Sequence, residues 1–275
     1  MAKRLPIAWR RALFRQGHIL LAAGLLAIWT LLKPGLAAPL LLPFWIVSAQ
    51  LIFAGSFEAA RQRRRAWLGQ YLLTASPWHR WLRGGVLMAL GHQLVAIVLS
   101  LLLLVKLRLV PSVYWLILCT AIVILVVSQK AIRRRVRRHV VGNFVSALSR
   151  RLVMWPAGLL LMLLLVLTAV WLPQPYLVGL GWEESLIRHI STAAGDSLLG
   201  MLERLGQALE LTQYWAMQNA LEWSGFGQGL ALLGWLLLLF THSAFAWAFI
   251  RVLIGADTLR DMVERTHDAE SKDMS

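Results

Sequence analysis

Three polar side chains, Gln50, His92 and His242, interrupt long apolar stretches of the sequence. A polar or ionisable group inside hydrocarbon is costly, so such residues carry a functional hypothesis by default. Two histidines at one depth on different helices could ligate a b-type haem, relay protons or line a path for a small substrate. The simpler interpretation is that the three side chains form hydrogen bonds between helices, each contributing about 0.6 to 2 kcal/mol.

The three polar residues share a predicted depth. Each lies seven or eight residues from the expected cytoplasmic end of its apolar stretch, at residues 57, 85 and 250. With a rise of 1.5 Å per helical residue, all three lie roughly 10 to 12 Å from that end. We therefore expect Gln50, His92 and His242 to face one another inside the protein, because an imidazole turns toward protein or trapped water rather than lipid.

Two basic runs are the other groups with evident binding chemistry, since clustered guanidinium groups attract phosphate. Each run lies at the expected cytoplasmic end of an apolar stretch, which is typical of the positive-inside rule and of contact with anionic lipids. Guanidinium groups can also pair with acidic faces of a cytosolic partner, and no specific nucleic-acid partner is expected. The runs consist of Arg61, Arg63, Arg64, Arg65, Arg133, Arg134, Arg135, Arg137 and Arg138.

The common catalytic signatures are not found in the sequence. There is no Walker A motif, no His-Glu-x-x-His and no Gly-x-Ser-x-Gly. Glu58 is the only carboxylate before Glu183, and Cys119 is the only cysteine, so the spans offer no carboxylate pair and no cysteine-based metal site. We expect a protein that is not an enzyme and that has no metal site and no cofactor, with haem b as the alternative.

The elements that position these residues follow from composition. Hydrophobic residues make up 59% of the 275-residue chain, charged residues only 15%, and the mean hydropathy is +0.64. Soluble domains have about 25% charged residues, so this balance argues against a soluble enzyme. The sequence predicts an all-α, polytopic transmembrane helical bundle that forms a single integral membrane domain over residues 1–275. Its six spans are expected at residues 17–32, 36–57, 85–105, 109–128, 152–172 and 228–250.

The distribution of basic residues predicts how the chain is oriented. With both ends in the cytoplasm, the cytoplasmic segments hold 23 lysines and arginines and the external segments hold 5. We therefore expect an N-in and C-in protein in a bacterial-type inner membrane. Short connections with proline or glycine, such as Lys33-Pro34-Gly35, predict that the six spans form three consecutive hairpins.

The last hairpin differs because residues 173–227 separate its two spans. Apolar residues recur there at steps of mostly three to five, which predicts amphipathic helices on the external face of the membrane. After the last span, residues 251–275 are expected to form an acidic cytoplasmic tail in which Asp257 caps a short helix. This tail could pair with Arg133–Arg138, dock onto a basic cytosolic partner, or remain solvated.

Taken together, these features favour a non-enzymatic, multi-pass inner-membrane subunit, permease-like or scaffold, of a transport, secretion or envelope-assembly complex. One alternative is an autonomous small-molecule transporter that uses Gln50, His92 and His242. Another is a haem- or quinone-associated electron-transfer subunit. The expected partners are a bilayer with anionic lipids and other membrane or cytosolic protein subunits.

Overall fold

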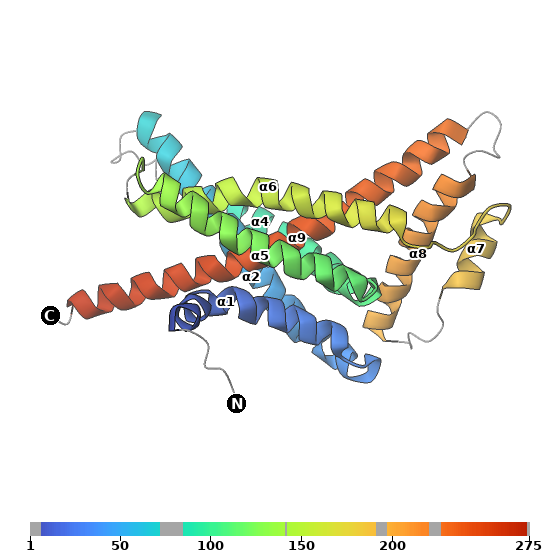
Figure 1. Ribbon diagram of the computed structural model, residues 1–275, viewed down its shortest axis with the longest axis horizontal. Helices are drawn as coiled ribbons and strands as arrows, with labels where there is room; N and C mark the ends of the chain where they lie inside the picture. Colours follow the sequence, from blue (N-terminus) through green and yellow to red (C-terminus); the bar gives the residue numbers. More distant parts are fainter. Residues whose placement is uncertain (1–6, 72–84, 141, 191–196, 220–226, 274–275) are drawn as a thin grey trace.

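The computed structural model describes residues 7–71, 85–140, 142–190, 197–219 and 227–273, and all regular structure within these ranges is helical (Figure 1). Short connections containing proline separate α1 from α2 and α4 from α5, because proline lacks the N–H that would continue the preceding helix. The helices are α1 (Ile7–Leu31), α2 (Pro34–Tyr71), α4 (Val86–Leu109), α5 (Val113–Val136), α6 (Gly142–Trp171), α7 (Trp182–His189), α8 (Leu198–Asn219) and α9 (Gly227–Asp273).

Among the described residues, five helical segments are long and apolar enough to cross a membrane. A sixth apolar segment, Gln16–Leu31 in α1, is shorter than these five. The chain is therefore an all-helical, multi-pass membrane protein, as the sequence predicts. The five segments are Pro34–Arg64, Val86–Leu109, Val113–Val136, Phe144–Trp171 and Gly229–Val263.

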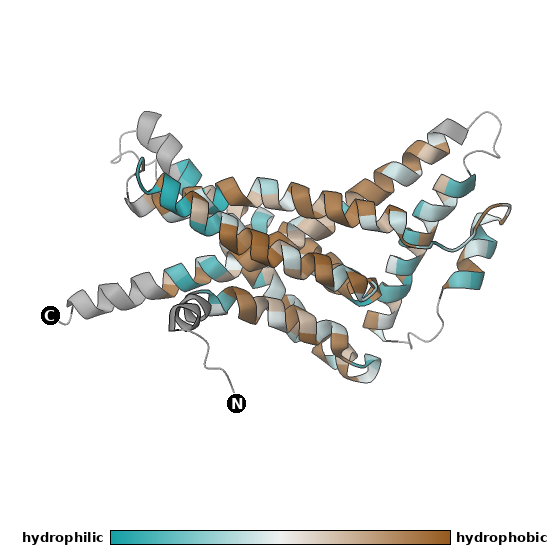
Figure 2. Cartoon of the chain, in the orientation of Figure 1, coloured by the Kyte–Doolittle hydropathy of each residue, from teal (hydrophilic) through white to brown (hydrophobic). Residues whose placement is uncertain are grey.

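Helix α9 lies at the centre of the bundle. It packs against α1, α2, α4, α6 and α8, and its aromatic residues Phe245 and Phe249 are fully buried. The other extensive contacts join α2 to α4 and α5 to α6, so the helices connected by the two shortest turns are not each other's main packing partners. Large apolar side chains remain exposed around the bundle, and Figure 2 shows that hydrophobic residues fill its middle while polar residues gather toward its ends.

Helices α2 and α9 approach each other very closely where they cross. Gly55 of α2 meets Gly255 of α9, and a Cβ atom built on Gly255 would lie 1.9 Å from the backbone oxygen of Leu51. Only glycine fits at such a distance, and small residues allow this close van der Waals packing between membrane helices. This crossing fixes the register of α2 against α9.

Helix α9 extends well beyond the predicted end of the last span. It runs without a break from Gly227 to Asp273, and the residues from Val252 to Thr258 are buried. The prediction that a tail begins at residue 251 and that Asp257 caps a separate helix is therefore wrong. The physical reason is that Val252, Leu253 and Ile254 continue the apolar face of the span past the charged Arg251.

Helices α7 and α8 lie in the long connection between α6 and α9, where the sequence predicts amphipathic helices. Figure 1 shows α8 crossing one end of the bundle, opposite the end at which α1 begins and α9 finishes. We call these two ends the α8 end and the Asp257 end. Helix α8 packs on α9 and α4, and α7 packs on α8, so this connection is folded against the bundle.

The Gly55–Gly255 crossing predicts that Gly255→Ala destabilises the protein. The new Cβ would overlap the α2 backbone, and overpacking of this kind costs about 1 to 3 kcal/mol. Gly229→Ala is the matched control, because a Cβ at Gly229 of the same helix meets open space. Thermal melting of both variants in mild detergent should lower Tm only for Gly255→Ala; equal melting of the two would contradict the crossing.

Candidate functional site: a buried polar cluster at the Asp257 end

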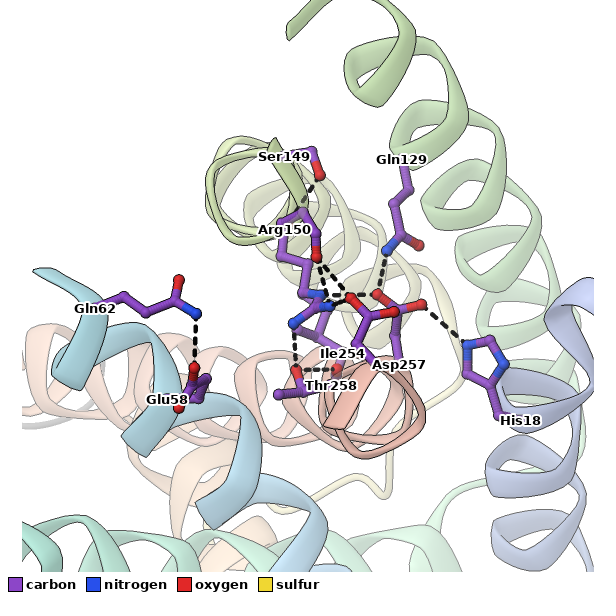
Figure 3. Close-up of polar contacts among 11 residues, drawn as sticks. His18, Glu58, Gln62, Gln129, Ser149, Arg150, Ile254, Asp257 and Thr258 are labelled. Atoms are coloured by element: carbon purple, nitrogen blue, oxygen red, sulfur yellow. Dashed lines mark hydrogen bonds and ion pairs between the residues drawn. The ribbon is translucent and has the colours of Figure 1, made fainter. Parts of the chain in front are cut away.

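Asp257 of α9 is the centre of a polar cluster that joins four helices (Figure 3). The residue is only 8% exposed. One carboxylate oxygen, Oδ1, lies 3.1 Å from His18 Nε2 on α1. The other, Oδ2, accepts hydrogen bonds from Gln129 Nε2 of α5 at 2.7 Å and from Arg150 Nε of α6 at 2.8 Å. Both oxygens of the buried carboxylate therefore have partners.

Arg150 is the second charged residue of the cluster, and it is buried too. Beyond Asp257, its guanidinium group donates to Thr258 Oγ1 at 3.1 Å and to Ser146 Oγ at 2.9 Å, and it pairs with Asp261. Ser146 Oγ also donates to Asp261 Oδ2 at 2.6 Å. A guanidinium group presents its donors in a fixed planar fork, which suits this simultaneous pairing with two carboxylates. We call these residues the Asp257 cluster: His18, Gln129, Ser146, Arg150, Asp257, Thr258 and Asp261.

Helical spacing explains why these side chains converge. Asp257 and Asp261 lie four residues apart on α9, and Ser146 and Arg150 lie four residues apart on α6, so each pair shares one face of its helix. The two faces meet because α6 and α9 pack along each other. None of these residues belongs to the site predicted from the sequence. There, Arg150 was only one of the many basic residues that set the orientation, and Asp257 was assigned to a tail. The cluster could have been predicted from the four-residue spacings of Ser146 and Arg150 and of Asp257 and Asp261, together with the apolar pattern of α9 that continues up to Asp257.

The three polar residues singled out in the sequence lie in different environments. His242 is buried in α9, where its Nδ1 atom lies 2.9 Å from the Leu238 carbonyl oxygen. His92 of α4 is half-buried, with its ring centroid 6.4 Å from that of Phe57 on α2. Gln50 of α2 is exposed on the surface of the bundle. The structure does not bring the three side chains together.

The separation of the two histidines follows from the helix crossing. His92 lies beside Phe57, two residues beyond Gly55, which touches Gly255. His242 lies thirteen residues before Gly255 in the same helix, a distance of about 20 Å along α9. The predicted common depth is wrong because it relies on a span ending at residue 250, whereas the buried apolar face of α9 continues through Val252, Leu253 and Ile254. Two axial histidines must reach one iron, so these two do not form a haem site together.

The two basic runs lie where α2 and α5 finish, on the surface. The Arg61, Arg63 and Arg64 side chains of the first run are exposed, and that of Arg65 lies outside the described side chains. All five arginines of the second run are exposed: Arg133, Arg134, Arg135, Arg137 and Arg138. Part of this second run lines a cavity of about 580 Å³ that opens beside Asp257 and Asp261.

Ion pairs also fasten the α8 end. Lys106 of α4 lies 2.9 Å from Glu210 of α8, and Arg108 of α4 pairs with Glu203 of the same helix. The Arg108 guanidinium also donates to the Leu32 carbonyl oxygen at 3.0 Å, which ties the end of α1 to this group. On α8, burial together with the nearby Glu210 carboxylate raises the pKa of the Tyr214 phenol. Helix α8 is thus held at this end by paired charges as well as by apolar packing.

The described residues contain no group of three or more histidine, cysteine, aspartate or glutamate side chains placed to hold a metal ion. No protein-family model matches the sequence, and searches of curated proteins and of solved structures found no similar chain. The fold and the site themselves define the class: an all-helical multi-pass membrane protein whose helices are joined at each end of the bundle by buried or half-buried ion pairs.

The pairing in the Asp257 cluster predicts a non-additive pattern of stability changes. Arg150→Leu leaves the buried Asp257 carboxylate without its main counter-charge, and breaking such a pair costs about 3 to 5 kcal/mol. The double variant Arg150→Leu with Asp257→Leu should lose less than the sum of the two single losses, because residues in one network couple.

Thermal melting in mild detergent measures these effects. Arg151→Leu is the control, because Arg151 is the exposed neighbour of Arg150 and its replacement removes the same charge. If Arg150→Leu melts like Arg151→Leu, or if the losses in the double variant simply add, the cluster does not hold α6 to α9.

Proposed function

We propose that the chain spans a bacterial-type inner membrane six times, with both ends in the cytoplasm and residues 173–227 outside. Helix α1 supplies the sixth span: its apolar segment Gln16–Leu31 extends about 24 Å, and the helix continues back to Ile7 through the basic residues Arg10, Arg11 and Arg15 at the expected cytoplasmic end. The two basic runs and the Asp257 cluster gather toward one end of the bundle, and α7 and α8 toward the other. This arrangement agrees with the positive-inside rule.

Reporter fusions test the orientation. Fusions after Arg65, Arg138 and Gln207 should give cytoplasmic, cytoplasmic and external signals, because 23 of 28 basic residues then lie inside. A phosphatase and a fluorescent-protein reporter at each position act as controls for one another, since each is active on only one side. A cytoplasmic signal after Gln207 would remove the fifth or the sixth span from this topology.

We further propose that the protein is a non-enzymatic subunit, permease-like or scaffold, of a transport, secretion or envelope-assembly complex. The observation that supports this role is how the buried charges are used. Arg150 bonds to Asp257, Asp261, Ser146 and Thr258, and Asp257 also to His18 and Gln129. These groups join helices to one another, which suits a rigid frame for partner subunits more than a site where a substrate must exchange.

The two alternative roles find less support in the geometry. An autonomous transporter built on Gln50, His92 and His242 needs these side chains in one place, and they occupy an exposed, a half-buried and a buried position on three helices. An electron-transfer subunit with haem between His92 and His242 needs both rings at one iron, and about 20 Å of α9 separates their levels. We retain both alternatives as outcomes of the experiment below.

Purification in mild detergent discriminates between the three roles. For a subunit, other proteins should co-purify in constant, stoichiometric amounts across independent preparations and across size-exclusion fractions. A lone protein that moves solute when placed in liposomes would favour the transporter, and a Soret absorption band would favour the electron-transfer subunit. A lone, colourless and inert protein would contradict the subunit role.

The acidic end of α9 can be tested as a partner contact in the same experiment. Truncation after Val263 removes Glu264, Asp268, Glu270 and Asp273 while leaving Asp257 and Asp261 in the cluster. If the removed segment docks onto a basic partner, the truncated protein should insert and melt normally but lose that subunit. Unchanged assembly would exclude this docking role.

A further inference from the structure

A basic cavity lies directly beside the Asp257 cluster. Its volume is about 580 Å³, within the range of about 300 to 1,000 Å³ that is usual for small-molecule sites. Five of the residues that line it are cationic: three lie in α5, one directly follows the end of α5, and one lies in α9. We call it the basic pocket, and its cations are Lys130, Arg133, Arg134, Arg137 and Arg260.

The basic residues at the end of α5 that line the pocket lie on one face of the helix. Residues 130, 133, 134 and 137 follow the spacing of a single helix face, and all of them line the pocket. Arg135 and Arg138 belong to the same run but do not line it. The positive-inside rule requires basic residues at this end of a span, without requiring that they converge on one cavity. Their convergence calls for a separate explanation.

The charges of the pocket do not balance within the described chain. The two carboxylates in its wall, those of Asp257 and Asp261, already pair with Arg150, which lies outside the pocket lining. In contrast, Lys130, Arg133, Arg134 and Arg137 form no ion pair with any described residue. Like charges three or four residues apart on a helix repel one another. An anion in the pocket would relieve this repulsion.

Phosphate suits this arrangement better than a carboxylate would. Several guanidinium groups offer planar, paired donors, a geometry that matches the oxygens of phosphate and allows two bonds per arginine. More than one negative charge is needed to offset the surplus of cations over carboxylates in the lining. A ligand with one doubly charged phosphate, or with two linked phosphates, meets this requirement.

The path that leads to the pocket points to a lipid as the source of the phosphate. Val123 and Val127 of α5 are exposed, with 60% and 58% of their surfaces accessible. At steps of four and three residues they continue toward Lys130 and then Arg134 on the same side of the helix. An apolar stripe that ends at a cationic pocket matches an acyl chain with its headgroup above it, and basic pockets between membrane helices bind such headgroups.

We infer that the basic pocket binds a phosphate-bearing anion supplied by the headgroup of an anionic phospholipid. The acyl chain lies along Val123 and Val127, and the phosphate lies among the cations of α5. The inference depends on membrane insertion and is independent of the subunit role, so failure of co-purification would leave it standing. Because Asp257 and Asp261 share the pocket wall, the headgroup would also lie against the cluster that joins the helices.

Two matched double variants test the pocket. Arg134→Gln with Arg137→Gln removes two lining charges, and Arg135→Gln with Arg138→Gln removes two charges from the same run outside the lining. The side chains of Arg134 and Arg137 have no ion-pair partner among the described residues, so both variants should fold; melting without lipid checks this. The probes are tetraoleoyl cardiolipin, dioleoyl phosphatidylglycerol and dioleoyl phosphatidylcholine in mixed micelles, and inorganic pyrophosphate.

Binding is measured by native mass spectrometry and by the rise in Tm on lipid titration. The wild type and the Arg135/Arg138 variant should bind one anionic lipid with similar affinity and show little response to phosphatidylcholine. The Arg134/Arg137 variant should bind it on the order of thirtyfold more weakly, as the usual contribution of two basic residues implies. Equal losses in the two variants would show unspecific surface attraction and overturn the inference. Equal protection by pyrophosphate would overturn the lipid source in favour of a free phosphate compound.

Discussion

A carboxylate in the central helix of a membrane bundle is tolerated only if its charge is neutralised at close range, and Asp257 sets this requirement here. Its two oxygens take partners from α1, α5 and α6, and one of these partners, Arg150, is bound in turn to Asp261. The helices are thereby restricted in position along α9. A shift of one turn, about 5.4 Å, is close to the spacing of Asp257 and Asp261, so it would break at least one of the two pairs with Arg150 and leave one carboxylate without this partner.

At the opposite end of the bundle, ion pairs also join helices, here two helices that lie across one another. Lys106 and Arg108, in the last turn of α4, pair with Glu210 and Glu203 of α8. Two residues before Asp257, the contact of Gly55 with Gly255 brings the backbones of α2 and α9 together where side chains would hold them apart. Ion pairs at the two ends and one steric contact therefore define the arrangement, while the many exposed leucines and valines around the bundle are suited to lipid.

The sequence predicts the helical class and most apolar segments because these depend on local composition and length alone. The amphipathic helices between α6 and α9 were predicted for the same reason. The Asp257 cluster was not, because its partners lie 107, 128 and 239 residues from Asp257 in the chain, and no local pattern links them. The predicted meeting of His92 and His242 is wrong because of one boundary. The last span was expected to end at residue 250, but the buried face of α9 continues through Val252, Leu253 and Ile254, so His242 lies farther from that end of the helix than the sequence suggested.

The unbroken length of α9 has a mechanical consequence. Forty-seven residues extend about 70 Å, which exceeds the 40 to 45 Å of a bilayer with its headgroups. This single helix contacts α8 through Thr241 and Gln213 and holds Asp257 sixteen residues later. A continuous helix resists bending. A tilt or rotation of α8 that moves α9 at their contact would therefore also displace the Asp257 carboxylate. The two ends of the bundle are thus mechanically connected through a single helix.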